Sequence, residues 1–327
     1  MADNDIRAQM TDVTFEYQPG VGVYDLDLAV RRGSIMGLIG PSGCGKTTTV
    51  RLLLGLLKPQ QGQTRLLGQD SLHLSSADRE RIGYMPQHFV LYPDLTVDEN
   101  LRFAASLYGV SLLKRGKIIR RMLETVQLSD AHRRLARDLS GGMQRRLELA
   151  ASLLHEPELI FADEPTSGID PVLRGRLWDY LRDYRAQGKT MFVTTQYVGE
   201  AAYCDLVGVM AGGRLLHLDT PENLYRKALG GEIITITVEP GQLYTLMGVL
   251  RRDARILRML TVTDQPGTLH LTVDNSGEMI PQVLELVSSQ PDLAVRQINR
   301  YEPSFDEIFA DLIQQKRQDS APGRDEP

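Results

Sequence analysis

The chain has 327 residues, of which 42% are hydrophobic and 24% charged, an ordinary globular composition. The net charge of −5 argues weakly against a protein that coats nucleic acid or an anionic membrane. The two cysteines, Cys44 and Cys204, exclude a disulfide framework and favour a reducing compartment. The polar N-terminus lacks a signal-peptide pattern, and no apolar run is long enough to predict a bilayer-spanning segment.

Apolar runs typical of buried strands alternate with helical patterns through about residue 225. The expected strands cover residues 34–40, 81–87, 158–164, 189–196 and 205–213. The expected helices cover residues 45–57, 97–110, 141–156 and 171–188. This alternation predicts an α/β domain with a mostly parallel sheet that is covered on both faces.

From residue 232 a different order begins. The pattern predicts a strand, a helix over 241–256, a hairpin over 258–274, a helix over 277–289 and a last strand. This is the order of a small ferredoxin-like α+β domain, and a final helix over 304–315 follows it. We therefore expect domains over 1–230 and 231–315 and a disordered polar tail over 316–327. Within the second domain, His270 is interpreted as an exposed strand residue and not as a ligand.

The stretch GPSGCGKTT matches the phosphate-binding pattern G-x-x-x-x-G-K-[ST] and lies between an expected strand and an expected helix. Glycines let the backbone N–H groups point inward at phosphate oxygens, and the helix N-terminus adds its dipole. Lys46 is expected to reach the β- and γ-phosphates, and Thr47 to ligate Mg²⁺. The loop residues that would hold the nucleotide are Gly40, Pro41, Ser42, Gly43, Cys44, Gly45, Lys46, Thr47 and Thr48.

Cys44 lies inside this loop and is interpreted as a small spacer. The alternative is a reactive thiol whose pKa is depressed by the helix N-terminus. A second expected strand, ELIFADEP, ends in two acids. At the carboxyl edge of a parallel sheet, Asp163 can sit beside the magnesium, and Glu164 can orient and polarise an attacking water. The alternative for these two acids is a surface pair that caps the next helix.

The stretch LSGGMQRR, residues 139–146, is absent from many P-loop proteins and so restricts the possible families. Together with GPSGCGKTT, YMPQ, FADEP and SGID, it resembles the nucleotide-binding subunit of ABC transporters over roughly residues 10–230. The resemblance implies a P-loop NTPase fold that binds and hydrolyses ATP with Mg²⁺. It implies that Gln87 contacts Mg²⁺ and links the site to the membrane subunit, and that Asp163 and Glu164 are the Walker B pair.

The resemblance also implies a split site. Ser140, Gly141 and Gly142 match the signature motif, which contacts the γ-phosphate bound by the opposite protomer. Asp170 matches the loop that crosses the dimer interface. Tyr17 lies where the family usually places an aromatic ring that stacks on adenine, although a purely structural tyrosine is the alternative. The helix start at residue 140 offers free N–H groups and a positive dipole end, which suits an anion.

Gln196 is a departure from the family. The strand after Walker B usually ends in a histidine that touches the γ-phosphate, and here the stretch VTTQY places a glutamine there. Glutamine can donate to phosphate but cannot become cationic. We therefore expect an active but slower ATPase. The alternatives are activity that needs a complementary partner site, and a nucleotide-gated regulator with little turnover.

The C-terminal stretch YEPSFDEIFADL, residues 301–312, resembles the ending of ATPases that serve drug, antibiotic or lipid exporters, similar to daunorubicin-resistance ATPases. The resemblance implies a separate permease, a second ATPase protomer, a place at the cytoplasmic face of the membrane, and a dimerising or regulatory second domain. The apolar residues Phe89, Leu91, Tyr92 and Leu95 suit a groove for the permease. A clamp on nucleic acid or ribosomes is disfavoured, because the sequence has one Walker A motif and one signature motif. The transported substrate cannot be inferred from the sequence.

Overall fold

The computed structural model describes residues 5–251, 253–262, 265–291, 293–301, 303–309 and 312–313. The chain divides into two compact units, Met1–Pro221 and Glu222–Pro327. The boundary expected from the sequence follows residue 230, which is after helix α7 (Pro221–Leu229), whereas the two compact units divide near the start of this helix. The tail expected to be disordered, 316–327, lies outside the described residues.

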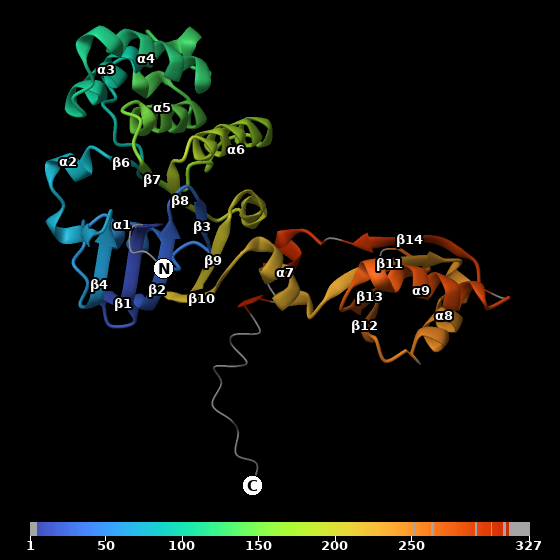
Figure 1. Cartoon of the computed structure of the whole chain (residues 1–327). Coiled ribbons are helices and arrows are strands. Elements are labelled where there is room, and N and C mark those ends of the chain that lie inside the picture. Colours follow the sequence, from blue (N-terminus) through green and yellow to red (C-terminus); the bar gives the residue numbers. More distant parts are fainter. Residues whose placement is uncertain are drawn as a thin grey trace. The chain divides into compact units, whose positions relative to one another are not determined.

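A six-stranded sheet forms the centre of the first unit (Figure 1). Its order is β10-β9-β3-β8-β7-β6, with bounds β3 Ile35–Ile39, β6 Ile82–Met85, β7 Leu159–Asp163, β8 Thr190–Thr195, β9 Leu206–Ala211 and β10 Arg214–Asp219. Neighbours from β9 through β6 run parallel, whereas β10 pairs antiparallel. Strands β3, β7 and β8 are buried along their whole length, which explains why their sequences are mostly apolar. The predicted mostly parallel sheet is confirmed.

A second sheet of the first unit is antiparallel, in the order β2-β1-β4-β5. Its strands are β1 Ile6–Gln18, β2 Val21–Arg31, β4 Gln61–Leu66 and β5 Gln69–Asp70. Both long strands mix buried with exposed side chains, because one face of this sheet meets the core and the other meets solvent. The sequence pattern indicated only a short strand-like stretch around Tyr17 in this region.

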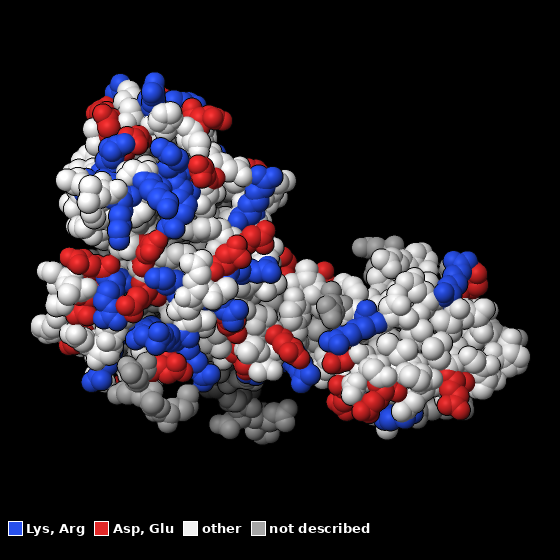
Figure 2. Space-filling view, turned by 45° about the horizontal axis from the view of Figure 1, so that its top comes forward, with Lys and Arg blue, Asp and Glu red and all other residues white. Residues whose placement is uncertain are grey.

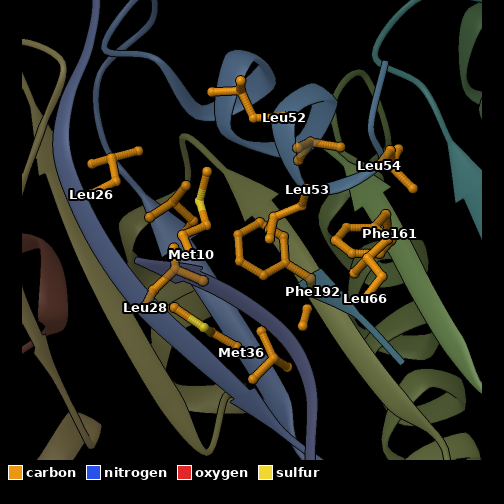
Figure 3. Packing of buried hydrophobic residues seen from close by; sticks show 14 of the residues in the cluster. Met10, Leu26, Leu28, Met36, Leu52, Leu53, Leu54, Leu66, Phe161 and Phe192 are labelled. Atoms are coloured by element: carbon orange, nitrogen blue, oxygen red, sulfur yellow. The ribbon is translucent and has the colours of Figure 1, made fainter. Parts of the chain in front are cut away.

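The core of the first unit lies between the two sheets and helix α1 (Lys46–Leu53). Leu53 of α1 belongs to one cluster with Phe161 of β7, Phe192 of β8 and Met10 of β1 (Figure 3). The centroids of the two phenyl rings lie 5.7 Å apart. Burial of each such side chain contributes roughly 1.5–3 kcal/mol. The cluster therefore holds α1, and with it the loop before α1, against the parallel sheet.

Further helices of the first unit are α2 Ser76–Arg79, α3 Val97–Leu107, α4 Leu112–Thr125, α5 Gly141–Leu153 and α6 Pro171–Ala186. Thr96 caps α3 in a complete capping box, in which the Glu99 carboxylate accepts from the Thr96 backbone N–H. Helix α4 is an additional helix that the sequence pattern did not indicate. None of the described helices is both long and apolar enough to cross a membrane.

The second unit contains a four-stranded antiparallel sheet in the order β12-β13-β11-β14. Its elements are β11 Glu232–Val238, α8 Leu243–Leu250, β12 Ile256–Thr261, β13 Thr268–Val273, α9 Ser276–Ser288 and β14 Val295–Tyr301. The predicted ferredoxin-like order is confirmed. The helix expected over 241–256 is shorter in the structure, where α8 ends at Leu250. Asp253 accepts from the Arg255 N–H in a turn that leads into β12. Residues 305–309 are helical, as expected.

Candidate functional site

The carboxyl ends of β3, β7 and β8 meet at one edge of the central sheet. The parallel register pairs Ile39 with Thr195 and Asp163 with Thr194. Ligands of open parallel sheets bind at this edge. The register therefore brings together three segments that are far apart in the chain, and the residues that follow these strands are Gly40, Glu164 and Gln196.

The loop between β3 and α1 has a conformation that requires glycine. Gly43 and Gly45 have φ values of 78° and 110°, which other residues adopt only with strain. A Cβ on Gly45 would lie 2.6 Å from Cγ1 of Val23 and 2.7 Å from Cε of Met210. Helix α1 begins directly after Gly45, so its free N–H groups and the positive end of its dipole lie beside the loop. This backbone is suited to bind an anion.

Lys46 is buried and reaches from this loop to the end of β7. Its Nζ donates to the carbonyl of Gly40 at 2.8 Å and to the carbonyl of Pro41 at 3.2 Å. The same Nζ lies 3.5 Å from Oε1 of Glu164, and the two side chains are only 5% and 9% exposed. A buried carboxylate needs a counter-charge, and Lys46 supplies one to Glu164.

Gln87 joins the loop to the same carboxylate. Its Nε2 donates to Oε2 of Glu164 at 3.2 Å, and its Oε1 accepts from Oγ1 of Thr47 at 3.4 Å. Gln87 follows β6, which is the neighbour of β7 in the sheet. The structure thus brings together four of the expected site residues, which are Lys46, Thr47, Gln87 and Glu164.

Asp163 and Glu164 end β7 in an unusual environment. Asp163 is fully buried, and its Oδ1 accepts from Oγ1 of Thr194. Its Oδ2 has no hydrogen-bond partner among the described residues, although buried carboxylate oxygens nearly always have one. Glu164 has a φ of 51°, a left-handed conformation that costs on the order of 1–3 kcal/mol outside glycine. The backbone N–H of Glu164 donates to the Thr194 hydroxyl at 3.0 Å, and this hydrogen bond supports the conformation of Glu164.

A cavity of about 310 Å³ opens at this edge of the sheet. Tyr17 is among its lining residues and is 53% exposed, and its ring meets the Phe15 ring edge-on at 4.8 Å. An exposed aromatic ring beside an anion site is placed to stack on a base. The other lining residues are Val21, Gly22, Ser42, Gly43, Gly45, Lys46, Thr47, Thr48, Gln87 and Glu164.

Gln196 lies exposed at the end of β8. Its Oε1 accepts a hydrogen bond from Oγ of Ser42 at 3.1 Å, so it contacts the loop that follows β3. With the oxygen used in this way, the amide N–H groups of Gln196 remain as donors. A carboxamide at this position offers polarity without charge.

The site has the groups that a magnesium nucleotide requires. The loop N–H groups and Lys46 are donors for phosphate oxygens. The Thr47 hydroxyl, the Gln87 amide oxygen and the orphaned Oδ2 of Asp163 are hard oxygen ligands of the kind that Mg²⁺ prefers. The residues present therefore fit both groups.

The remaining expected residues lie away from this cavity. Ser140 caps α5, and its Oγ accepts from the backbone N–H of Met143 at 3.3 Å. Asp170 caps α6, and its Oδ1 accepts from the N–H of Leu173 at 3.0 Å. Ser140, Gly141 and Asp170 are exposed. The residues that line the cavity include none of the expected set Ser140, Gly141, Gly142 and Asp170.

Cys44 lacks the environment of an activated thiol. Its side chain is buried, and this burial raises the pKa of the thiol while nearby Lys46 acts in the opposite direction. The alternative of a depressed pKa was wrong, because desolvation outweighs the helix N-terminus here. A Cβ on Gly40 would lie 2.6 Å from its Sγ, so Cys44 fills the space under the loop.

Some residues of the site were missed from the sequence. Thr194 holds both acids at the end of β7, and its position two residues before Gln196 in the same strand was the available signal. Arg145 lies on α5, is buried, and donates to the carbonyls of Asp163 and Glu164. The spacing of the predicted helix did not mark Arg145 as buried.

Residues 23–167 match the family model described as ABC transporter. The chain is 41% identical over 214 residues to the "Probable multidrug ABC transporter ATP-binding protein YbhF" of Escherichia coli K12. That match covers 65% of this chain, and this chain spans only 37% of that relative's length. The chain is also 37% identical over 294 residues to the daunorubicin resistance ATP-binding protein DrrA3 of Streptomyces coeruleorubidus, which covers 88% of this chain and 89% of that one.

A solved structure with the same fold is the dimeric, post-hydrolysis state of the ATP-binding cassette MJ0796 bound to ADP and Pi. The TM-score is 0.61 at 26% identity, and the match covers 65% of this chain and 98% of that chain. The family match lies in the first unit and includes the glycine loop and the acids at the end of β7. The chain belongs to the ABC transporter family, among its ATP-binding proteins.

Proposed function

We propose that this chain binds and hydrolyses ATP and thereby powers export through a separate membrane permease. The observation that carries the proposal is the convergence of Lys46, Thr47, Gln87 and Glu164 around one cavity. Lys46 and Thr47 come from the glycine loop, Gln87 from YMPQ, and Glu164 from FADEP, so three separate motifs meet at the cavity. An unrelated glycine-rich turn would not require all of these contacts.

Each side chain then has a defined task. The loop N–H groups and Lys46 bind the β- and γ-phosphates, and Tyr17 stacks on the adenine. Thr47, Gln87 and Asp163 hold Mg²⁺, which neutralises charge on the phosphates when bound. Glu164 orients and polarises the attacking water. Gln196 donates an uncharged hydrogen bond towards the γ-phosphate.

Two copies of the chain complete the sites. Ser140 caps a 13-residue helix whose start, at Ser140 and Gly141, is exposed and does not line the chain's own cavity. The start of a helix is suited to bind an anion. In a head-to-tail dimer, each nucleotide lies between the loop of one copy and the signature of the other, with Asp170 at the interface. The similarity to a dimeric ATP-binding cassette supports this arrangement.

The permease would dock on the segment after Gln87. Val90 and Tyr92 are large apolar residues with 64% and 50% exposure, and Phe103 of α3 stacks edge-on against Tyr92. The expected groove residues Phe89, Leu91 and Leu95 are partly exposed beside them. The chain would thus sit at the cytoplasmic face of the membrane through its permease.

The cargo is a drug-like or lipid-like molecule in this proposal. The names of the multidrug and daunorubicin relatives support the drug-like cargo, and the lipid-like cargo rests on the resemblance of residues 301–312 alone. Nucleic acid is not proposed as a partner. Figure 2 shows acidic side chains interspersed with the Lys and Arg side chains on the visible face of the first unit, and the net charge is −5. A regulator with little turnover is less favoured, because Glu164 and its supports are all in place.

The test is Mg-ATP hydrolysis by the purified chain over a series of protein concentrations, with Glu164→Gln beside it. We expect turnover to rise more steeply than linearly with concentration, because a dimer forms the site. Glu164→Gln should still bind ATP and lose nearly all turnover. Equal turnover in the wild type and in Glu164→Gln would contradict the proposal.

A further inference from the structure

Arg145 and Glu148 form an ion pair inside the first unit. They lie one turn apart on α5, and Nη1 of Arg145 is 2.8 Å from Oε2 of Glu148. Their side chains are only 9% and 1% exposed. Replacing a buried ion pair by apolar side chains of similar size is often neutral or stabilising. The stability of the fold alone therefore does not account for this pair.

Arg145 contacts both acidic positions through their backbone. Its Nη2 donates to the carbonyl oxygens of Asp163 and Glu164, at 2.7 Å each. Its Nη1 also donates to the carbonyl oxygen of Pro86 at 2.6 Å, and Pro86 directly precedes Gln87. One rigid guanidinium thus spans the end of β7, where Glu164 has a strained φ, and the segment that carries Gln87.

Glu148 holds the other end of the Gln87 segment. Its Oε1 accepts from the backbone N–H of Val90 at 2.8 Å, while its Oε2 pairs with Arg145. Burial raises the pKa of the Glu148 carboxyl, and the Val90 N–H and Arg145 act in the opposite direction. Segment 86–90 is therefore fastened at both ends to one helix that also fixes Glu164.

We propose that Arg145 and Glu148 are positioning residues that set the placement of Gln87 relative to Glu164 and so determine the rate of hydrolysis. This inference rests on the proposed function. Neither side chain lines the cavity, so the pair acts on turnover and leaves nucleotide affinity nearly unchanged. Because Val90 is exposed on segment 86–90, a partner that moves this segment acts on the same alignment.

The experiment compares full chains carrying Arg145→Met, Glu148→Leu and both changes together. Each single variant leaves a buried charge alone and should lower the unfolding midpoint, whereas the double variant should recover most of it. We expect the double variant to bind a fluorescent ATP analogue within about twofold of wild type. Its kcat should still be lower on the order of 10²-fold, because misplacement of about 1 Å costs that much.

The matched control is Arg182→Met with Asp179→Leu, an exposed pair at the same spacing on α6 with 55% and 72% exposure. It should leave kcat unchanged. Arg145→Lys is the conservative variant: it keeps the charge, and because one ammonium cannot replace the guanidinium fork, its kcat should fall between the wild type and Arg145→Met. If kcat recovers together with the unfolding midpoint in the double variant, the pair is merely structural and the proposal is overturned.

A second readout separates this inference from the proposed function. Amide hydrogen exchange over 86–90 should accelerate in the double variant and stay unchanged in the control, because the Val90 N–H loses its acceptor. If the wild type shows no turnover, the proposed function fails while this readout still decides the positioning role. Unchanged exchange over 86–90 in the double variant would overturn it.

Discussion

Gln196 limits the chemistry at the end of β8. Its Oε1 accepts from Oγ of Ser42, so the side chain contacts the glycine loop. Hydrogen bonds from a charged donor are about twice as strong as neutral ones. A histidine at this position can become cationic, and glutamine cannot. In the proposed function, this strand end keeps a donor for phosphate and lacks the charge that a histidine could supply.

We expect Gln196→His to raise kcat, by up to about 10²-fold if the charge acts as a preorganised donor does. The KM for ATP should change by about twofold or less, since the neutral donor already binds the ground state. Steady-state Mg-ATP hydrolysis of both chains, from pH 5.5 to 8, measures this. The variant should gain a pH dependence near the usual histidine pKa of about 6.5.

Gln187→His is the control for this change, since Gln187 is an exposed glutamine at the end of α6. It should leave both kcat and KM unaltered. An unchanged or lower kcat in Gln196→His would mean that the site is adapted to the carboxamide and that the charge is not missing.

Sequence reasoning identified most of the candidate site because each motif fixes a backbone position. Gly45 is required by its φ of 110°, and Lys46 follows it directly, so spacing alone places the side chain. Thr194 and Arg145 were missed because their contacts come from neighbouring strands and from α5, over long sequence distances. The spacing of residues along the sequence does not report such contacts.

His155 joins three elements of the first unit. It follows α5, its ring stacks on Tyr108 at the end of α3 with centroids 3.7 Å apart, and its Nε2 donates to the carbonyl of Ile82 in β6 at 3.2 Å. Its Nδ1 is buried and has no partner within the described residues. Protonation would add a buried N–H without an acceptor, so burial lowers the pKa of His155 to about 4.

This depressed pKa predicts an acid-sensitive junction. The unfolded chain takes up a proton at the usual pKa of about 6.5, while the folded chain stays neutral until about 4. The contribution of neutral His155 to the free energy of unfolding is therefore present above pH 6.5 and is lost as the pH falls towards 4. The share of His155 is about 2 kcal/mol between pH 7.5 and pH 5, and urea unfolding at both values measures it.

His155→Phe keeps an aromatic ring against Tyr108 and should remove this share of the pH dependence. The matched change His73→Phe, at an imidazole that is 80% exposed, should leave the pH dependence as in the wild type. Equal acid sensitivity of His155→Phe and the wild type would place the titrating group elsewhere.

At the scale of elements, the buried strands were predictable and the antiparallel sheet was not. Strands β3, β7 and β8 are buried along their whole length and mostly apolar, because both of their faces are covered. Strands β1 and β2 carry several register shifts, and Asp12 and Asp25 have positive φ values within them. Each irregularity breaks the alternation of apolar and polar residues, which is the signal that identifies a half-buried strand.

At the scale of the whole molecule, the proposed site is divided between two chains, and this division can be tested by mixing. Lys46→Met disables the phosphate loop, and Ser140→Arg blocks the signature helix start. In a head-to-tail dimer, every homodimer of either variant has two broken sites. A mixed dimer has one site broken twice and one site intact, because the intact loop and the intact signature come from opposite chains.

A 1:1 mixture should therefore recover about a quarter of wild-type turnover, since half of the dimers are mixed and each has one intact site. Each variant alone should be nearly inactive. Mixing either variant with a chain that carries both changes is the control and should recover nothing. If the 1:1 mixture also stays inactive while both variants still fold and pair, the head-to-tail arrangement is wrong, and the loop and the signature must act within one chain.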